Sequence, residues 1–426
     1  MELAPKYVKT AGLFLAVLCL TASAQTADNY WPTWRGPTFT GATAKGNPPI
    51  TWSESENIKW KVSVPGEGHS SPIVWGDKIF FLTAVKVDGS DAYQFNVVCL
   101  EGTTGKELWQ KTAVKTTPHE GHHPTGSFAS YSPVTDGQYV WASFGSRGLY
   151  CYDVEGDLKW SNPLIQMSKR RAFGEGSSPC LAGDILAVVC DHEGQSVLFG
   201  FDKVTGKEIW KTNRDEGSNW TTPVAVETNG KWHIVINGTN FVRAYDAQTG
   251  EEIWRCSGQT RNAIPTPVPG LGKIFCTSGF GGKALQAITL GRTGDLSGTD
   301  AVAWEKKDDT PYVPSPAISD NRLFVIASGA PSNNGVVSCY NAQTGEAFYA
   351  KESLPDIDSI YGSFAIVGDR VYIADRKGTT VVLKNADTFE ILAVNKLDDG
   401  FNTTPAIAGD SLYLKGDNHF YCIAMP

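Results

Sequence analysis

The chain has 426 residues, a formal net charge of −8 and a sequence pI near 5.5. The acidic balance lacks the positive footprint of a nucleic-acid-binding protein, and no apolar run beyond the N-terminus reaches the ~18 residues that a membrane span needs. Thirteen Trp, 15 Tyr and 19 Phe against 3 Met favour strands and turns over helical bundles.

The first 24 residues predict a secretory signal peptide, with early lysines, an apolar stretch over 11–22 and a small-residue cleavage site ending at Ala24. Cleavage there would place the protein in the periplasm or the medium. Cys19 raises the question of a lipid anchor, but Leu18 stands where a lipobox needs a small residue. Residues 25–57 then form an N-terminal arm ahead of a set of repeats.

One repeated phrase ends in tryptophan. It runs over 100–109 (LEGTTGKELW), 201–210 (FDKVTGKEIW) and 245–254 (YDAQTGEEIW), with weaker copies at 152–160, 292–304, 340–349 and 388–392. Its Thr-Gly pair supplies the positive φ of a tight hairpin. The closing Trp can cover the outer edge of one unit and wedge against the next.

A second phrase alternates with the first: Ser or Thr before Pro, a Gly-Asp or Asp-Gly turn, and then an apolar strand. Its hydroxyl residues are Ser71, Ser132, Ser178, Thr222, Thr266, Ser315, Ser363 and Thr404, eight copies 41 to 61 residues apart, with Phe364 in place of the seventh proline. Each unit therefore predicts four antiparallel strands.

Eight such sheets cannot bury their faces alone, so the sequence predicts an all-β, eight-bladed β-propeller over residues 58–426. The last unit ends at Pro426 without a Trp-bearing outer strand, and residues 58–63 (IKWKVS) match the missing strand. We expect this N-terminal strand to close the ring on the last blade. An open solenoid of eight units is the alternative.

The Asp-x-x-Thr-Gly-x-x-x-Trp phrase resembles the tryptophan-docking repeat of pyrroloquinoline-quinone (PQQ)-type propellers. That superfamily includes the quinoprotein alcohol dehydrogenases and BamB, the propeller lipoprotein of the outer-membrane assembly machine. Residues 31–37 (WPTWRGP), 68–77 (GHSSPIVWGD), 132–137 and 144–149 resemble a subgroup of exported bacterial PQQ-like propellers. The resemblance covers nearly everything after residue 30. It implies the fold and leaves the function open, because one scaffold hosts many activities.

A quinoprotein dehydrogenase would imply PQQ and Ca²⁺ on the axis, a catalytic Asp and commonly a disulfide between adjacent cysteines. This chain has no Cys-Cys pair, and no motif places the calcium ligands or the Asp. A Gly-x-Ser-x-Gly elbow and a Gly-x-x-x-x-Gly-Lys-Ser/Thr loop are also missing from the sequence. The sequence therefore assigns no catalytic residue, metal ligand or cofactor, and PQQ with Ca²⁺ remains the alternative.

Residues leading into the inner strands should ring one mouth of the axial channel. The candidate ligand-binding residues at these positions are Glu67, His69, Glu175, Asn219, Trp220, Tyr312, Tyr361 and Asn402. Aromatic, amide, carboxylate and imidazole groups that converge on one funnel suit a sugar, peptide or small polar ligand. The alternative is that they only plug the channel. The repeat tryptophans Trp60, Trp109, Trp160, Trp210, Trp254 and Trp304 are predicted to be structural.

Two polar segments and the cysteines complete the predictions. The loop with His119, His122 and His123 is expected to be solvated rather than to bind metal, and Asp191–Gly194 to be a polar turn. After cleavage eight cysteines would remain: Cys99, Cys151, Cys180, Cys190, Cys256, Cys276, Cys339 and Cys422. Four of them occupy equivalent repeat positions, which favours buried free thiols over disulfides.

The sequence thus predicts an exported, monomeric, non-catalytic propeller that is a binding or scaffolding platform for a protein or for a polar small-molecule or carbohydrate ligand. No nucleic-acid partner and no transmembrane span in the mature chain are expected. One alternative is a PQQ-dependent oxidoreductase acting on alcohols or sugars. The other is an outer-membrane assembly scaffold similar to BamB.

Overall fold

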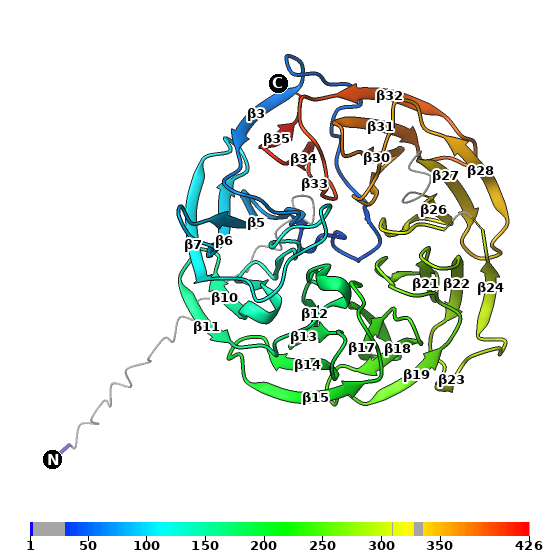
Figure 1. Cartoon of the computed structure of the whole chain (residues 1–426), viewed down its shortest axis with the longest axis horizontal. Helices are drawn as coiled ribbons and strands as arrows, with labels where there is room; N and C mark the ends of the chain where they lie inside the picture. Colours follow the sequence, from blue (N-terminus) through cyan, green and yellow to red (C-terminus); the bar gives the residue numbers. More distant parts are fainter. Residues whose placement is uncertain (3–29, 309, 328–334, 426) are drawn as a thin grey trace.

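Eight β-sheets stand around a central axis as the blades of a propeller (Figure 1). The structure is a computed structural model that describes residues 1–2, 30–308, 310–327 and 335–425, so nearly all of the predicted signal peptide lies outside the described residues. In these ranges the only helical segments are two 3-10 turns, Gly145–Arg147 and Arg170–Ala172. No helix in the described part of the chain is long and apolar enough to cross a membrane. The predicted all-β, eight-bladed propeller is confirmed, and the solenoid alternative is wrong.

The first four blades follow the chain from the inner strand outward. Blade 1 is β4 (Ile73–Trp75), β5 (Lys78–Lys86), β6 (Tyr93–Glu101) and β7 (Glu107–Thr116); blade 2 is β8 (Val134–Thr135), β9 (Tyr139–Ser143), β10 (Leu149–Asp153) and β11 (Leu158–Asn162); blade 3 is β12 (Cys180–Ala182), β13 (Ile185–Cys190), β14 (Ser196–Asp202) and β15 (Glu208–Arg214); blade 4 is β16 (Val224–Thr228), β17 (Lys231–Ile236), β18 (Val242–Asp246) and β19 (Glu252–Cys256).

The other four blades repeat the pattern. Blade 5 is β20 (Val268–Gly270), β21 (Lys273–Ser278), β22 (Ala284–Thr289) and β24 (Val302–Lys306); blade 6 is β25 (Ala317–Ser319), β26 (Arg322–Ala327), β27 (Val336–Asn341) and β28 (Ala347–Ser353); blade 7 is β29 (Ala365–Val367), β30 (Arg370–Ala374), β31 (Thr379–Lys384) and β32 (Ile391–Lys396); blade 8 is β33 (Ala406–Ala408), β34 (Ser411–Lys415), β35 (His419–Ile423) and β3 (Ile58–Ser63).

The middle strands are continuous apolar runs because both of their faces pack against neighbouring blades. All six residues of β13 are buried, whereas the outer strand β15 is exposed at most positions. The eight cysteines of the described residues are buried free thiols in these cores, as predicted.

The first propeller strand closes the ring. β3 pairs antiparallel with β35, with Lys61 opposite Tyr421 and Ser63 opposite His419. Trp60 of β3 packs in one core with Phe420 of β35. The predicted pairing of the N-terminal strand with the last blade is therefore confirmed.

Each repeat tryptophan sits on the next blade. The Trp160 ring lies over Gly206, where an added Cβ would meet the ring at 2.5 Å, and its Nε1 donates to the Lys203 carbonyl at 3.2 Å. Trp60, Trp109, Trp210 and Trp304 donate in the same way, at 2.9, 3.1, 2.9 and 3.1 Å. Gly206 has a φ of 73°, so this position needs glycine both for the turn and for the ring.

Trp254 departs from this pattern. Its buried Nε1 has no hydrogen-bond partner. In blade 5 an insertion between β22 and β24 forms β23 (Gly294–Asp295), which pairs parallel with β19 opposite Trp254. The insertion thus lies along the outer edge of blade 4, where a Thr-Gly turn of the next blade meets the tryptophan in other blades. Blade 4 therefore has five strands instead of four.

The N-terminal arm is part of the propeller, which corrects the expectation of four strands in every blade. Its β1 (Tyr30–Trp31) pairs with β4 and its β2 (Ala42–Thr43) pairs with β29, both on the axial side of the inner strand. The dark blue arm crosses the centre of the ring before it reaches β3 (Figure 1). Strands of two residues have no periodicity, so the sequence pattern could not reveal them.

Candidate functional site

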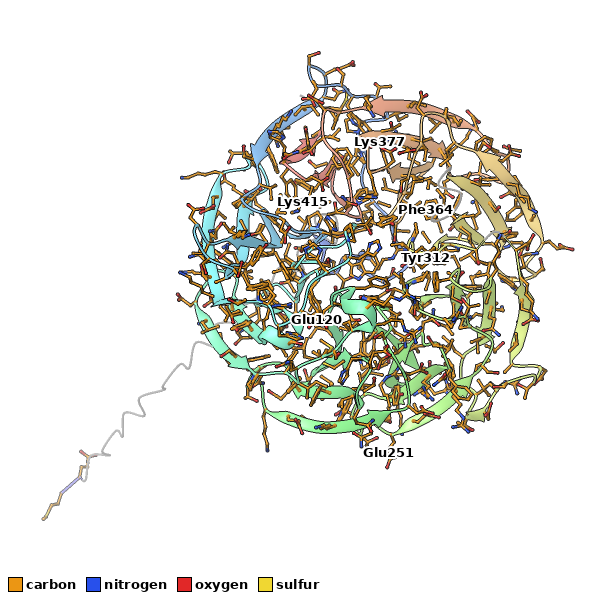
Figure 2. All side chains as sticks on the ribbon, in the orientation of Figure 1. Glu120, Glu251, Tyr312, Phe364, Lys377 and Lys415 are labelled. Carbon is orange, nitrogen blue, oxygen red and sulfur yellow. The ribbon has the colours of Figure 1, made fainter. Side chains whose placement is uncertain are left out.

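A cavity of about 450 Å³ lies on the propeller axis, within the range typical of small-molecule sites. Every blade contributes the hydroxyl residue of the Ser/Thr-Pro phrase and the residue two positions before it. The second set comprises His69, Ser130, Gly176, Trp220, Ile264, Val313, Tyr361 and Asn402. Tyr312, which also lines the cavity, lies near the centre of the ring, whereas Glu251 lies at its rim (Figure 2).

The eight hydroxyl residues form a closed hydrogen-bonded ring, which we call the hydroxyl ring. In each blade the backbone N–H of the hydroxyl residue donates to the side-chain oxygen of the equivalent residue in the next blade. The ring runs from Ser71 through Ser132, Ser178, Thr222, Thr266, Ser315, Ser363 and Thr404 back to Ser71, with N–O distances of 2.9 to 3.2 Å. The repeat therefore needs Ser or Thr here because each side-chain oxygen links two inner strands.

The arm forms the floor of the cavity. Its backbone bonds to the inner strands three residues past the hydroxyl ring, as in the Thr135 N–H to Pro32 carbonyl bond and the Ile318 N–H to Thr40 carbonyl bond, both 3.0 Å. Trp34 of the arm lines the cavity, and the Arg35 guanidinium lies 5.3 Å from the centre of the Trp34 ring. Arg35 is fully buried and donates to the Phe364 and Pro316 carbonyls.

Six of the eight candidate residues line the cavity: His69, Glu175, Trp220, Tyr312, Tyr361 and Asn402. Glu67 and Asn219 do not. Glu67 pairs through its backbone with Ala84, and its Oε1 lies 3.7 Å from His122 Nε2. Asn219 is buried, and its Oδ1 accepts a bond from the Thr239 hydroxyl at 3.0 Å.

The Glu175 carboxylate is held by donors of blade 2. It accepts bonds from the Tyr131 hydroxyl at 3.0 Å and from the Ser146 N–H and hydroxyl at 2.8 and 2.6 Å, and Arg147 approaches to 3.5 Å. Burial, and then the Glu175 charge, raise the pKa of Tyr131 well above its usual value, which keeps the phenol a donor. The carboxylate is thus a fixed wall of the cavity.

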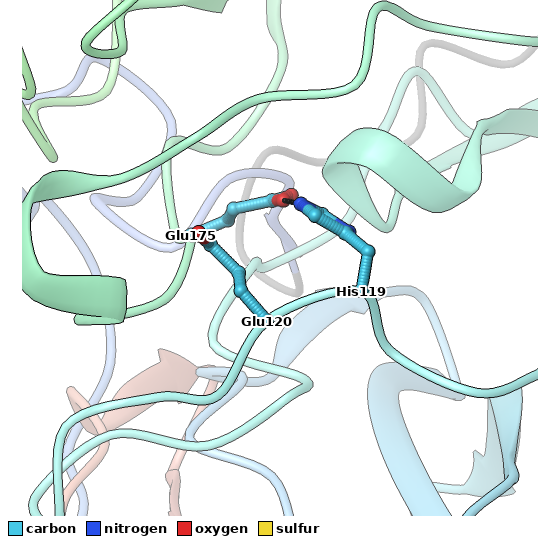
Figure 3. Close-up of side chains that lie close together, drawn as sticks. All are labelled: His119, Glu120 and Glu175. Carbon is cyan, nitrogen blue, oxygen red and sulfur yellow. Dashed lines mark ion pairs between the residues drawn. The ribbon is translucent and has the colours of Figure 1, made fainter.

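His119, Glu120 and Glu175 point toward one another, with candidate metal-ligand atoms within 4.8 Å (Figure 3). The bonds of this trio argue against a cation. His119 Nε2 lies 2.6 Å from the Met167 carbonyl, so it is the protonated nitrogen and cannot be a ligand. Glu120 accepts the Lys169 N–H, and Arg147 already supplies positive charge beside Glu175. We interpret the trio as a polar network.

The histidine loop is not simply solvated, contrary to the prediction. His122 and His123 are half-buried and meet the edges of Phe128 and Phe173, with ring centres 4.5 and 5.0 Å apart. His123 also lines the cavity. The predicted polar turn at 191–194 likewise begins in a buried ion pair, where Asp191 accepts two bonds from Arg214 at 2.8 and 3.0 Å.

Four groups beside the cavity have lowered pKa values. Burial lowers the pKa of Arg35 to about 9, so its guanidinium stays charged at neutral pH. Burial, and then the charges of Lys415, Arg376 and His122, lower the pKa of His69 to about 3, so its imidazole is neutral. Burial also lowers the pKa of Lys169 and of Lys415 to about 8, which still leaves both ammonium groups mostly charged at neutral pH.

Sequence reasoning missed several lining residues, namely Trp34, His123, Thr125, Arg171, Phe173 and Phe280. Trp34 comes from the arm, and the others come from loops of irregular length whose position depends on tertiary packing. Arg171 and Ala172 have φ values of 53° and 52°, left-handed conformations that mark a constrained loop at the mouth. The WPTWRGP phrase, which includes Trp34, is the one sequence signal for these residues, because it resembles a family motif.

A family profile described as "Outer membrane protein assembly factor BamB" matches residues 42–188, 94–239 and 194–425. No curated protein sequence matches the chain.

Solved structures with the same fold include both BamB and dehydrogenases. BamB from Moraxella catarrhalis has a TM-score of 0.60 at 16% identity, covering 86% of this chain and 96% of that one. A europium-containing methanol dehydrogenase scores 0.65 at 10% identity, covering 93% and 98%. The quinohemoprotein alcohol dehydrogenase from Comamonas testosteroni scores 0.66 at 11% identity, covering 93% and 82%. At these identities the structural likeness shows the fold alone. The profile covers most of the chain, and the protein therefore belongs to the PQQ-like repeat propeller family described by the BamB profile.

Proposed function

We propose that this protein is an exported, non-catalytic binding protein that takes a small polar ligand into its axial cavity. The observation that carries the proposal is the cavity of about 450 Å³ itself, built from equivalent positions of all eight blades and floored by the arm. Aromatic side chains and the hydroxyl ring line it together, a mixture that suits a compact ligand with polar groups. Export is supported by the sequence of the first 24 residues.

The acid–base groups of the cavity support binding rather than catalysis. Tyr131 and Ser146 donate to Glu175, which occupies the lone pairs that a general base would use. A histidine with a pKa of about 3 is a weak base at neutral pH. His69 is then better suited to offer a neutral hydrogen-bonding ring to a ligand.

The calcium–PQQ pair of quinoprotein enzymes does not fit these residues. Calcium takes about six to eight oxygen ligands, usually with several carboxylates. Glu175 is the one carboxylate among the described residues that line the cavity, and protein donors hold it. A positively charged Arg147 beside it also disfavours a divalent cation.

A second candidate is a scaffold in outer-membrane protein assembly, as the family description implies. The observation that favours it is a series of exposed apolar side chains on the outer strands of blades 1 to 3: Leu108 on β7, Leu158 on β11 and Ile209 on β15. Insertion of a β-barrel protein into the outer membrane, followed in cells with and without Leu158→Asp, tests it. A scaffold predicts loss of insertion on this substitution. Normal insertion would contradict it.

Binding to the purified protein tests the main proposal. Trp34 and Trp220 line the cavity, so a ligand there should change the tryptophan fluorescence. A panel of sugars, dipeptides and organic acids, followed by fluorescence and calorimetry, should include a saturable ligand with one site per chain. PQQ with Ca²⁺, alcohols, sugars and a redox dye form the second arm. Dye turnover with PQQ would contradict the non-catalytic proposal.

A further inference from the structure

The hydroxyl ring presents eight hydrogen-bond donors to the cavity. Each of its oxygens accepts one backbone N–H, which leaves the hydroxyl proton to donate. Within the described residues, no protein group accepts any of these eight protons, although all eight residues are at least nine-tenths buried. A hydroxyl donor that lines the cavity without a protein acceptor can donate to a ligand there, so a ligand rich in acceptor oxygens can bond to several of these groups.

Arg35 adds a cation just below the ring. It has no exposed surface and is bonded to two backbone carbonyls, and no carboxylate of the described residues lies within ion-pair distance. Both carbonyls belong to residues that follow the ring directly, Pro316 after Ser315 and Phe364 after Ser363. The charge therefore sits under the floor of the cavity, behind Trp34.

Lys169 and Lys415 are two further buried ammonium groups bonded to backbone carbonyls. Lys169 Nζ donates to the Asp191 and Asn219 carbonyls at 2.7 and 2.6 Å, and Lys415 Nζ donates to the Gly68 carbonyl. Neither makes an ion pair with a carboxylate of the described residues. Burying a charge without a counter-ion is costly. Arg35 and Lys169 lie against the lining residues Trp34 and Trp220, and Lys415 is bonded to Gly68, the neighbour of the lining residue His69.

The nearby carboxylates are already engaged. Asp191, whose charge acts most strongly on Lys169, is bound in a bidentate pair by Arg214. Asp399 accepts bonds from the Asn418 and His419 N–H groups, at 3.1 and 2.7 Å for its Oδ2. Asp417 accepts a bond from Asn402 Nδ2 at 3.0 Å. These groups reduce the positive potential, but none of them lines the cavity. Glu175, whose charge also acts on Lys169, does line it, and its charge is offset by Arg147 at 3.5 Å and by the Tyr131 and Ser146 donors.

Four aromatic residues that line the cavity each have a cation near the ring. Trp220 has Lys169 at 4.7 Å from its ring centre, Tyr361 has Arg376 at 4.7 Å and Phe280 has Arg261 at 5.9 Å, as Trp34 has Arg35. The aromatics line the cavity and these four cations do not. A cation on one face of an aromatic ring offsets the negative electrostatic potential of that face. These walls therefore repel an anion less than aromatic rings without a cation would.

We infer that the axial cavity selects a small oxyanion-bearing ligand, an organic carboxylate with a hydroxylated or aromatic body. The inference rests on the binding role proposed above. The carboxylate would lie against the hydroxyl ring over Trp34, and the body would stack between the aromatic walls. Inorganic phosphate shares the oxyanion chemistry and is distinguished by experiment.

Matched pairs of probes test the inference by calorimetry on the full protein: D-glucuronate with D-glucose, and 4-hydroxybenzoate with 4-hydroxybenzyl alcohol, with inorganic phosphate as a separate arm. The acid of at least one pair should bind about tenfold or more tightly than its neutral partner. Tighter binding of phosphate than of both acids would overturn the assignment of the ligand as an organic carboxylate. Equal or tighter binding of the neutral partners would overturn the inference and leave the binding role intact. If no probe binds up to about 10 mM, both proposals fall.

Two substitutions separate charge from structure. Lys169→Met should weaken binding of the acid about tenfold. It removes a buried charge that has no counter-ion, but it also leaves the Asp191 and Asn219 carbonyls without a donor, so urea unfolding of this variant is measured alongside. Arg171→Gln, at an exposed residue that lines the mouth, should weaken it too and does not threaten folding. Arg170→Gln is the matched control, since Arg170 lies 3.6 Å from Glu193 and does not line the cavity. An unchanged ratio of acid to neutral affinity in Arg171→Gln would overturn the inference.

Discussion

Removing one oxygen from the hydroxyl ring should lower stability measurably. Ser315 Oγ accepts the Thr266 N–H at 2.9 Å, and both residues are 1% exposed. Ser315→Ala leaves that N–H without its acceptor in a buried position, which costs about 1–3 kcal/mol. Ser315→Thr keeps the oxygen and should cost less than about 0.5 kcal/mol. Thr is tolerated at this position, because three of the other seven blades contain Thr there and four contain Ser.

Equilibrium unfolding in urea measures this difference. The midpoint of Ser315→Ala should fall while the slope of the transition stays the same, because the substitution changes stability and not the exposed surface. Ser161→Ala, at an exposed position of β11, is the control for loss of a serine hydroxyl. If Ser315→Ala were as stable as Ser315→Thr, the ring bonds would contribute nothing to the joining of the blades and the reasoning would be refuted.

Three further predictions concern the closure strand, the mouth and the cores. Trp60→Ala should destabilise the protein by about 3–5 kcal/mol in the same assay because the ring packs against Phe420. Trp232→Ala, at a 39% exposed residue, should change the stability little. Equal effects of the two substitutions would contradict closure through Trp60. Because the pKa of His69 falls to about 3 in the folded protein, the unfolded chain binds a proton between about pH 6.5 and pH 3 that the folded chain does not. Stability should therefore drop as the pH falls through this window, and His69→Gln should flatten the drop. An unchanged pH profile in this variant would refute the lowered pKa of His69. The eight cysteines of the described residues should resist a thiol reagent in the native protein and react fully in urea, because burial raises the pKa of thiols such as Cys256 to about 11. Fewer than eight reactive thiols after unfolding, with Cys19 not counted, would show a disulfide.

The repeat phrases located the fold and most of the cavity wall from sequence. The Ser/Thr-Pro phrase fixes where each inner strand begins, so the residue two positions before it faces the axis in every blade. Residues one or two places farther out are less constrained. Glu175 and Tyr312 reach the cavity, but Asn219 turns into the network of Asp191 and Thr239 instead.

The floor of the cavity could not be predicted in this way. The arm contacts five blades through isolated backbone bonds and two strands of two residues each, features without a sequence period. The hydrogen-bond partners within the hydroxyl ring could not be predicted from the sequence either, because every bond joins residues of two different blades. The positions of Trp34 and Arg35 therefore emerge only from the assembled propeller.

Filling the cavity tests the central claim most directly. Gly176 lines the cavity with a negative φ, and an added Cβ would meet Ser130 Cβ at 3.4 Å, an ordinary contact, so Gly176→Leu should fold and occupy the ligand space. Gly217→Leu, at an exposed glycine of the equivalent loop in the next blade, is the control. Calorimetry of the tightest probe should show binding to the wild type and to Gly217→Leu and none to Gly176→Leu. Undiminished binding to a folded Gly176→Leu would place the ligand elsewhere and contradict the account.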